Sequence, residues 1–145
     1  MTARPAGTGA PRYTESLPCV RESARRARLL VTAALYAWGL PCMIDSAILV
    51  VSELVANAVE HSGGRLMRVT VARPQAHRVR IAVVDLSADH PVPRQAGDDD
   101  VRGRGLEIVT ALSDAWGTES LRWGRRQGKR VWADLRPACH TGADR

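Results

Sequence analysis

The sequence contains no phenylalanine and only one lysine, Lys129. A folded interior therefore has to be filled by Leu, Val, Ile, Ala and the four tryptophans. The chain also lacks an uninterrupted apolar run of the roughly 20 residues that a membrane span needs. Its uncharged stretch 29–44 contains Gly39 and Pro41, and it starts too far along the chain for a signal peptide. These absences predict a soluble protein with no membrane partner.

The cysteines and histidines show none of the spacings typical of structural metal sites or disulfide frameworks. Cys19, Cys42 and Cys139 are odd in number and widely separated, with no C-x-x-C pair. The four histidines, at positions 61, 77, 90 and 140, are too far apart for zinc-ligand spacing. This pattern favours a reducing compartment, and we expect a cytoplasmic location.

The positive net charge favours an anionic partner but does not identify it. The chain has 145 residues, enough for one domain with a real core, and its formal charge is +6. All basic residues except Lys129 are arginines, whose guanidinium groups suit phosphates and carboxylates. Nucleic acid is one such partner, but the arginines are scattered and not grouped with aromatic residues. We therefore expect no direct binding of nucleic acid.

Hydrophobic periodicity predicts an α+β fold. Apolar steps of three and four predict two helices, from Pro18 to Gly39 and from Pro41 to about His61. Period-two alternation predicts hairpins of residues 65–73 with 77–85 and of 115–123 with 128–136, and a third helix begins near 103–105. Residues 12–18 suggest a short edge strand. The expected architecture is a two-layer sandwich, with helices on one face of a mixed, mostly antiparallel sheet.

The same reading divides the chain into three parts. Residues 1–12 are rich in small residues, proline and glycine and are expected to be flexible. Residues 13–136 form the single domain, and residues 137–145 form a flexible tail. Residues 86–103 show no periodicity, and a loop of this length within a compact domain tends to be functional or mobile.

The second helix carries a polar ridge within the stretch SELVANAVEH, residues 52–61. Glu53, Asn57 and His61 are spaced four residues apart, so their side chains share one side of the helix. A helix side that simply faces solvent can show this spacing by chance. A functional interpretation is also open, because a carboxamide oxygen suits Mg²⁺ and a glutamate one turn away could accept a proton.

Asp85 is the second candidate. Val79, Ile81 and Val83 point to one side of their strand, and period two sends Asp85 to that same apolar side. A buried carboxylate there needs hydrogen-bond donors, for example an exocyclic amine of a ligand. In the alternative interpretation, the strand ends at Val84 and Asp85 begins a turn.

The third candidate is RGRGL, residues 102–106, at the start of the last helix. Glycines let backbone N–H groups approach an anion closely, and a helix N-terminus favours negative charge. The motif is weak alone, since glycines also simply end loops. It is not the dinucleotide fingerprint, because a third glycine and a preceding parallel strand are missing. GRRQGKR, residues 124–130, is one residue too short for a phosphate loop and has no Ser or Thr after its lysine.

These features occur in a fixed order: the helix ridge, the carboxylate at a strand end, the long loop and the glycine-opened helix. In that order they resemble the N box, G1 box, lid and G2 box of the GHKL ATPase superfamily. The resemblance covers about residues 13–136 and is closest to its small branch of anti-sigma factor serine/threonine kinases. SELVANAVEH and GRGLEIV are its specific parts, and GKRVWADL is similar to the closing strand.

The resemblance implies ATP and Mg²⁺ as cofactors and a role for each candidate. Glu53 would be the general base, and Asn57 the Mg²⁺ ligand. Asp85 would accept a hydrogen bond from the adenine amine. The remaining nucleotide contacts it implies are His61, Ser87, Gly103, Arg104, Gly105 and Leu106, with 88–102 as the lid.

The resemblance also implies protein partners. The protein would phosphorylate a serine or threonine of an antagonist protein and would sequester a sigma factor, and relatives often form homodimers. One departure favours an alternative: the G1 box usually reads D-x-G-x-G, and here Ser87 and Asp89 replace the glycines. The alternative function is a non-catalytic protein-interaction module with the same fold and weak or absent nucleotide turnover.

Overall fold

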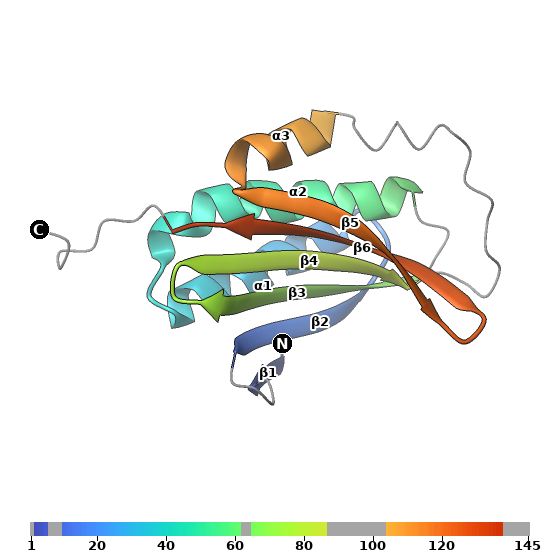
Figure 1. Ribbon diagram of the computed structural model, residues 1–145, viewed down its shortest axis with the longest axis horizontal. Helices are drawn as coiled ribbons and strands as arrows, with labels where there is room; N and C mark the ends of the chain where they lie inside the picture. Colours follow the sequence, from blue (N-terminus) through green and yellow to red (C-terminus); the bar gives the residue numbers. More distant parts are fainter. Residues whose placement is uncertain (1, 6–9, 62–64, 87–103, 138–145) are drawn as a thin grey trace, which may run out of the picture.

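A computed structural model describes residues 2–5, 10–61, 65–86 and 104–137. Its sheet has six strands in the order β1-β2-β3-β4-β6-β5, and every pairing is antiparallel. The helices cover one face of this sheet, and the other face is turned toward the viewer in Figure 1. The α+β two-layer architecture predicted from the sequence is therefore confirmed.

The elements follow the predicted order. The strands are β1 (Thr2–Pro5), β2 (Pro11–Pro18), β3 (Leu66–Gln75), β4 (Arg78–Leu86), β5 (Ala115–Trp123) and β6 (Arg126–Leu135). The helices are α1 (Ser23–Ala37), the short 3-10 helix η1 (Pro41–Met43), α2 (Ile44–His61) and α3 (Arg104–Leu112). The two predicted hairpins are β3–β4 and β5–β6, and both form.

Helix α1 ends where the sequence places its stop signal. Ala27, Leu30, Val31 and Ala34 lie on one side of the helix and are buried against the core. Gly39 follows with a φ of 72°, a left-handed conformation that glycine adopts without steric cost and that turns the chain toward α2.

Helix α2 is the central core helix. Proline opens the preceding turn of η1, and the buried positions of α2 repeat at helical spacing: Ala47, Val50, Val51, Leu54, Val55 and Ala58. The combined segment Pro41–His61 is long and apolar enough to cross a membrane by length and composition alone. In the structure its apolar side instead contacts α1, α3, β4 and β6. Burial in the core accounts for the apolar composition.

The N-terminal strands differ from the expectation. Residues 12–18 form most of β2 as predicted, but β2 is not an edge strand, because Thr2–Pro5 pairs with it as β1. The small residues and prolines of this segment conceal the strand in the sequence. Of the predicted C-terminal tail, only Pro137 lies within the described residues.

The cysteines also depart from the expectation. The Sγ of Cys19 donates a hydrogen bond of 3.7 Å to the backbone oxygen of Ala58 in α2. Cys42 in η1 is disulfide-bonded. Cysteine spacing did not predict a disulfide, so the argument from spacing to a reducing compartment is wrong on this point.

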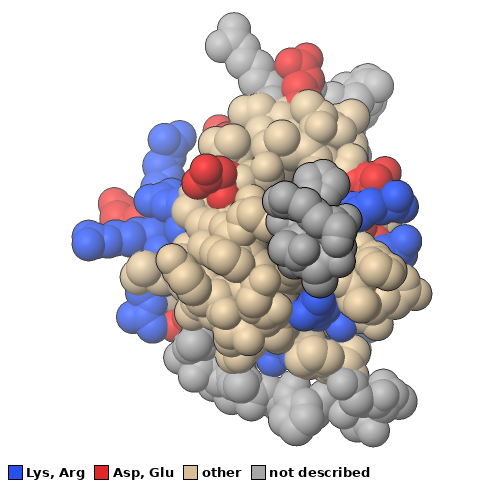
Figure 2. All heavy atoms as spheres, turned by 90° about the vertical axis from the view of Figure 1, so that its left-hand side faces the viewer, with Lys and Arg blue, Asp and Glu red and all other residues tan. Residues whose placement is uncertain are grey.

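Basic side chains project from both layers of the molecule. In Figure 2, Lys and Arg gather at the left margin, on the helix side, and at the right margin, on the sheet side. Between the two groups most of the surface carries no basic side chain in this view, and a few basic side chains lie near its lower centre. The positive charge does not form one continuous stripe there, which agrees with the scattered arginines of the sequence.

An ion pair between the partly exposed Arg80 and the buried Asp134 lies on the open face of the sheet. Arg80 donates two hydrogen bonds to the Asp134 carboxylate, at 2.6 and 2.8 Å, and its guanidinium lies 4.5 Å from the ring centroid of Trp132. The hydrogen bond to Asp134 raises the pKa of Arg80. On β5, Gly117 is the partner of Trp132, and a Cβ there would lie 2.9 Å from Cζ2 of the ring. The tryptophan therefore fits only against a glycine.

We expect Gly117→Ala to destabilise the protein by about 1–3 kcal/mol, because the indole is held between Arg80 and the sheet and has to shift. Chemical denaturation measures the loss. In a Trp132→Ala background the same substitution should cost less than half as much, since the obstructing ring is gone. An equal cost in both backgrounds would mean that the contact with Trp132 is not its source.

Candidate functional site

The predicted ridge lies on the side of α2 that faces away from α1. Arg28 of α1 donates a hydrogen bond of 3.3 Å to Ser52, which fixes Ser52 on the α1 side of α2. Each residue turns the helix by about 100°, so Asn57 lies about 140° around the axis from Ser52. Glu53 and His61 are one turn before and after Asn57. Helix α3 packs on the far side of α2 from α1 (Figure 1), so the ridge is directed toward α3.

Asn57 carries the most informative atom of the ridge. Its Oδ1 is buried and has no hydrogen-bond partner among the residues that the structure describes. Leaving a buried carboxamide oxygen unpaired costs free energy, so such an atom calls for an explanation. A hard cation that prefers oxygen ligands provides one. The residue therefore fits the predicted role of Mg²⁺ ligand.

The neighbours of Asn57 suit a site that keeps most of its metal ligands as water and phosphate. Among the described residues, no group of three His, Cys, Asp or Glu could hold a metal ion. Glu53 is partly exposed, and its carboxylate makes no hydrogen bond or ion pair with a described side chain. Mg²⁺ bound through one or two protein oxygens and nucleotide phosphates matches this arrangement.

His61 is the last residue of α2. Its Nε2 lies 3.8 Å from Oε1 of Glu60, and its side chain is 22% exposed. The imidazole therefore stands at the C-terminal end of the ridge, next to an acidic neighbour that points to solvent. This position is compatible with a contact at the rim of the site.

Asp85 points into the helix-covered side of the sheet, as its strand period predicted. It is 5% exposed and lies between Met67 of β3 and Lys129 of β6 in the register. Strand β4 continues to Leu86, so the alternative interpretation, in which the strand ends at Val84, is wrong. The result is a buried carboxylate at the C-terminal end of β4.

Lys129 is a neighbour of this carboxylate that the sequence analysis did not assign. It is the register partner of Asp85 and therefore points to the same side of the sheet. In the sequence it belongs to GRRQGKR. This segment forms the β5–β6 turn and the start of β6, so it is not a phosphate loop. Only the strand register brings its lysine beside Asp85.

Helix α3 begins at Arg104, at the place predicted from RGRGL. Leu106 is 4% exposed and anchors the first turn in the core, and its backbone oxygen accepts a hydrogen bond of 2.7 Å from the Thr110 hydroxyl. Arg104 and Gly105 form the N-terminus of the helix, where the first backbone N–H groups have no partner within the helix and can bind an anion. Ser87, Gly103 and the predicted lid, 88–102, lie outside the described residues.

The fold brings the three candidate regions to one side of the molecule. In Figure 1 the C-terminal end of α2, the C-terminal end of β4 and the start of α3 are all directed toward the right. Helix α2 contacts both β4 and α3. The ridge, Asp85 and the start of α3 are far apart in the sequence, and this packing is what groups them.

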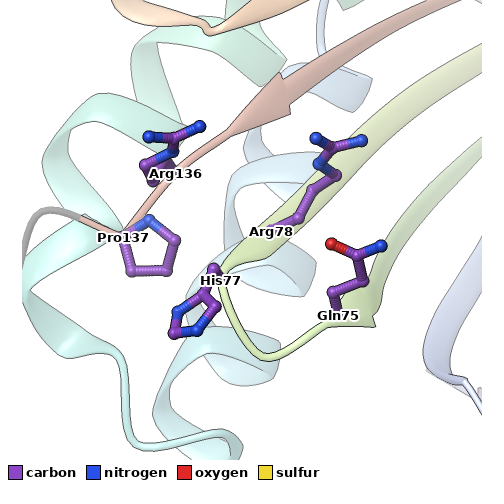
Figure 3. Close-up of a pocket in the computed structure, with 5 residues that line it drawn as sticks. All are labelled: Gln75, His77, Arg78, Arg136 and Pro137. Atoms are coloured by element: carbon purple, nitrogen blue, oxygen red, sulfur yellow. The ribbon is translucent and has the colours of Figure 1, made fainter.

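A hollow of about 470 Å³ lies at the opposite end of the sheet, around the β3–β4 turn. It is lined by Gln75, His77, Arg78, Arg136 and Pro137 (Figure 3). Both of its arginines already have carboxylate partners: Arg78 lies 3.6 Å from Asp134, and Arg136 lies 3.1 Å from Asp114. The hollow contains none of the predicted site residues, so it is a feature separate from the candidate site.

Comparison with known proteins agrees with this geometry. No curated protein sequence matches the chain. The family model described as histidine kinase-like ATPase domain matches residues 17–134, a span that runs from the end of β2 to the end of β6. This span includes the ridge, Asp85 and the start of α3, and it supports ATP as the ligand. Because the match covers most of the chain, this protein belongs to the histidine kinase-like ATPase domain family.

Proposed function

We propose that the protein is an ATP- and Mg²⁺-dependent serine/threonine kinase of the anti-sigma factor type. It would phosphorylate a small antagonist protein and would also sequester a sigma factor by direct contact. The single observation that carries the nucleotide part is the buried, unpartnered Oδ1 of Asn57 on the same side of α2 as Glu53. The identity of the protein partners rests on the resemblance of the motifs.

The residues of the ridge divide the work of phosphoryl transfer. Bound Mg·ATP supplies the γ-phosphoryl group, with the metal neutralising charge on its oxygens. Asn57 would hold the metal through its carboxamide oxygen. Glu53, about 6 Å away along the axis, accepts the proton of the attacking hydroxyl as the new O–P bond forms and the bond to ADP breaks.

The other two regions hold the ends of the nucleotide. Asp85 is buried and accepts a hydrogen bond from the adenine amine, which gives the site its preference for adenine. Arg104 and Gly105, at the start of α3, present backbone N–H groups to the phosphates. Transfer then depends on positioning and on electrostatics more than on covalent chemistry by the protein.

The replaced glycines of the G1 box favour a second candidate function. Ser87 and Asp89 stand where glycines usually allow close approach to the nucleotide. In this alternative the protein binds its partner protein without transferring a phosphoryl group. The cytoplasmic location belongs to the proposal too, and since Cys42 is disulfide-bonded, it depends on the proposed function and not on the cysteines.

Asn57→Ala should weaken binding of Mg·ATP about tenfold or more without destabilising the fold. The substitution removes a metal ligand, and it also removes a buried oxygen that has no partner to lose. Isothermal titration with ATP, with Mg²⁺ and with EDTA, measures the first effect, and thermal unfolding measures the second.

Ser52→Ala is the matched control, because it removes a polar group from the opposite side of the same helix. It should leave Mg·ATP affinity within twofold of wild type. Equal affinity of wild type and Asn57→Ala in Mg²⁺ would rule out the metal role of Asn57.

Glu53→Gln should lower phosphotransfer by about 10²- to 10⁴-fold and leave ATP binding intact, since the amide keeps the shape but cannot accept the proton. Radiolabelled ATP and a set of purified antagonist candidates provide the assay. Glu60→Gln, an exposed change on the same helix, should transfer at the wild-type rate. If Glu53→Gln transfers phosphate at the wild-type rate, Glu53 is not the general base. If the wild-type protein transfers phosphate to no candidate, the non-catalytic alternative is favoured.

Asp85→Asn should reduce discrimination between ATP and GTP by about tenfold, because an amide can donate to the guanine oxygen that a carboxylate repels. Competition binding of the two nucleotides to wild type and variant gives the ratio. An unchanged ratio of ATP to GTP affinity would mean that the nucleotide base does not contact Asp85.

A further inference from the structure

The open face of the sheet carries an ordered set of arginines that the nucleotide site does not use. Antiparallel register aligns the outward residues of five strands in rows across the sheet. One row is Arg12, Ala72, Arg80, Asp134 and Ala115; the next is Thr14, Thr70, Ala82, Trp132 and Gly117; the third is Ser16, Arg68, Val84, Arg130 and Glu119. These rows face the viewer in Figure 1.

The first and third rows each contain two arginines, and the row between them contains none. Ala72 and Arg68, four residues apart on β3, mark these two rows, which are therefore about 14 Å apart at 3.4 Å per residue. Within each row the two arginines are two strands apart, or about 10 Å. The row between them, the central strip, contains no charged residue.

Two of the four arginines are held by carboxylates of the same face. Arg80 is paired with Asp134, which is 3% exposed. Arg130 donates to Glu119 at 2.8 Å. The other two, Arg12 and Arg68, are exposed and pair with no described carboxylate. Four arginines against two carboxylates leave the three rows with a net charge of +2.

The side chains of the central strip are held in place by their neighbours. Thr14 and Thr70 share a hydrogen bond of 3.2 Å, and Ala82 is 4% exposed. Trp132 lies over Gly117, and the Arg80 guanidinium covers its ring. A partner can therefore lie across this strip with little rearrangement, which lowers the entropic cost of binding.

We propose that this face is a docking surface for an acidic segment of a partner protein, bound chiefly by Arg12 and Arg68. Carboxylates four residues apart in an extended segment are about 14 Å from one another, which matches the distance between the two arginine rows. Guanidinium groups form bidentate hydrogen bonds with carboxylates, so each free arginine offers a specific contact. This proposal does not depend on nucleotide binding.

The same surface suits nucleic acid less well. Sequence-tolerant binding of single strands relies on aromatic rings on which bases stack. Trp132 is the only aromatic residue in the three rows, and the guanidinium of Arg80 lies over its ring. Salt bridges with a protein partner remain possible without any free ring, so the observations favour an acidic protein segment.

The test uses the full-length protein without nucleotide, at physiological salt, and a fluorescein-labelled peptide of twelve glutamates as the probe. We expect Arg12→Glu/Arg68→Glu to weaken binding at least tenfold. Arg21→Glu/Arg25→Glu, two exposed positions on the helix side, changes the net charge equally and should weaken binding less than twofold. Backbone NMR shifts on adding the peptide should map to Thr14 and Thr70, and unfolding temperatures check that both variants fold.

Three results would overturn the proposal. The first is an absence of peptide binding by the wild-type protein, and the second is equal weakening in both double variants, which would show a response to net charge alone. The third is tighter binding of a twelve-nucleotide oligothymidylate than of the peptide, with the same dependence on Arg12 and Arg68. That result would assign the face to single-stranded nucleic acid.

Discussion

Helix α2 has to meet two demands with one stretch of eighteen residues. One side must be apolar enough to bury against the sheet and its two neighbouring helices, and another side must keep polar groups at four-residue spacing. Both demands are met because 3.6 residues per turn separates the two sets of positions around the axis. The buried oxygen of Asn57 lies where the two sides meet. The rest of the candidate site is arranged around that boundary.

The partner elements acquire their roles through contact with this helix. Near its C-terminal end, strand β4 directs Asp85 at the helix layer, and α3 begins on the side of α2 opposite α1. Neither feature indicates much in isolation, because a buried aspartate and a glycine-opened helix are both common. Both elements pack against α2, which makes the three signals one candidate site, and the family match spans all three.

The sequence predicted those parts that local periodicity controls. The side taken by Asp85 followed from alternation along a single strand, and the ridge followed from the repeat of a single helix. The sequence did not predict that Lys129 would lie beside Asp85, because that contact depends on the register between β4 and β6. Arg12 and Arg68 are 56 positions apart in the sequence, and only the register between β2 and β3 brings them to the same face of neighbouring strands.

The short strand β1 changes what the sheet presents to its surroundings. It pairs with the first half of β2, so the sheet ends on this side in a strand of only four residues. Sheet edges are the places where separate chains join by backbone pairing. An edge strand this short offers few backbone groups for pairing with another chain.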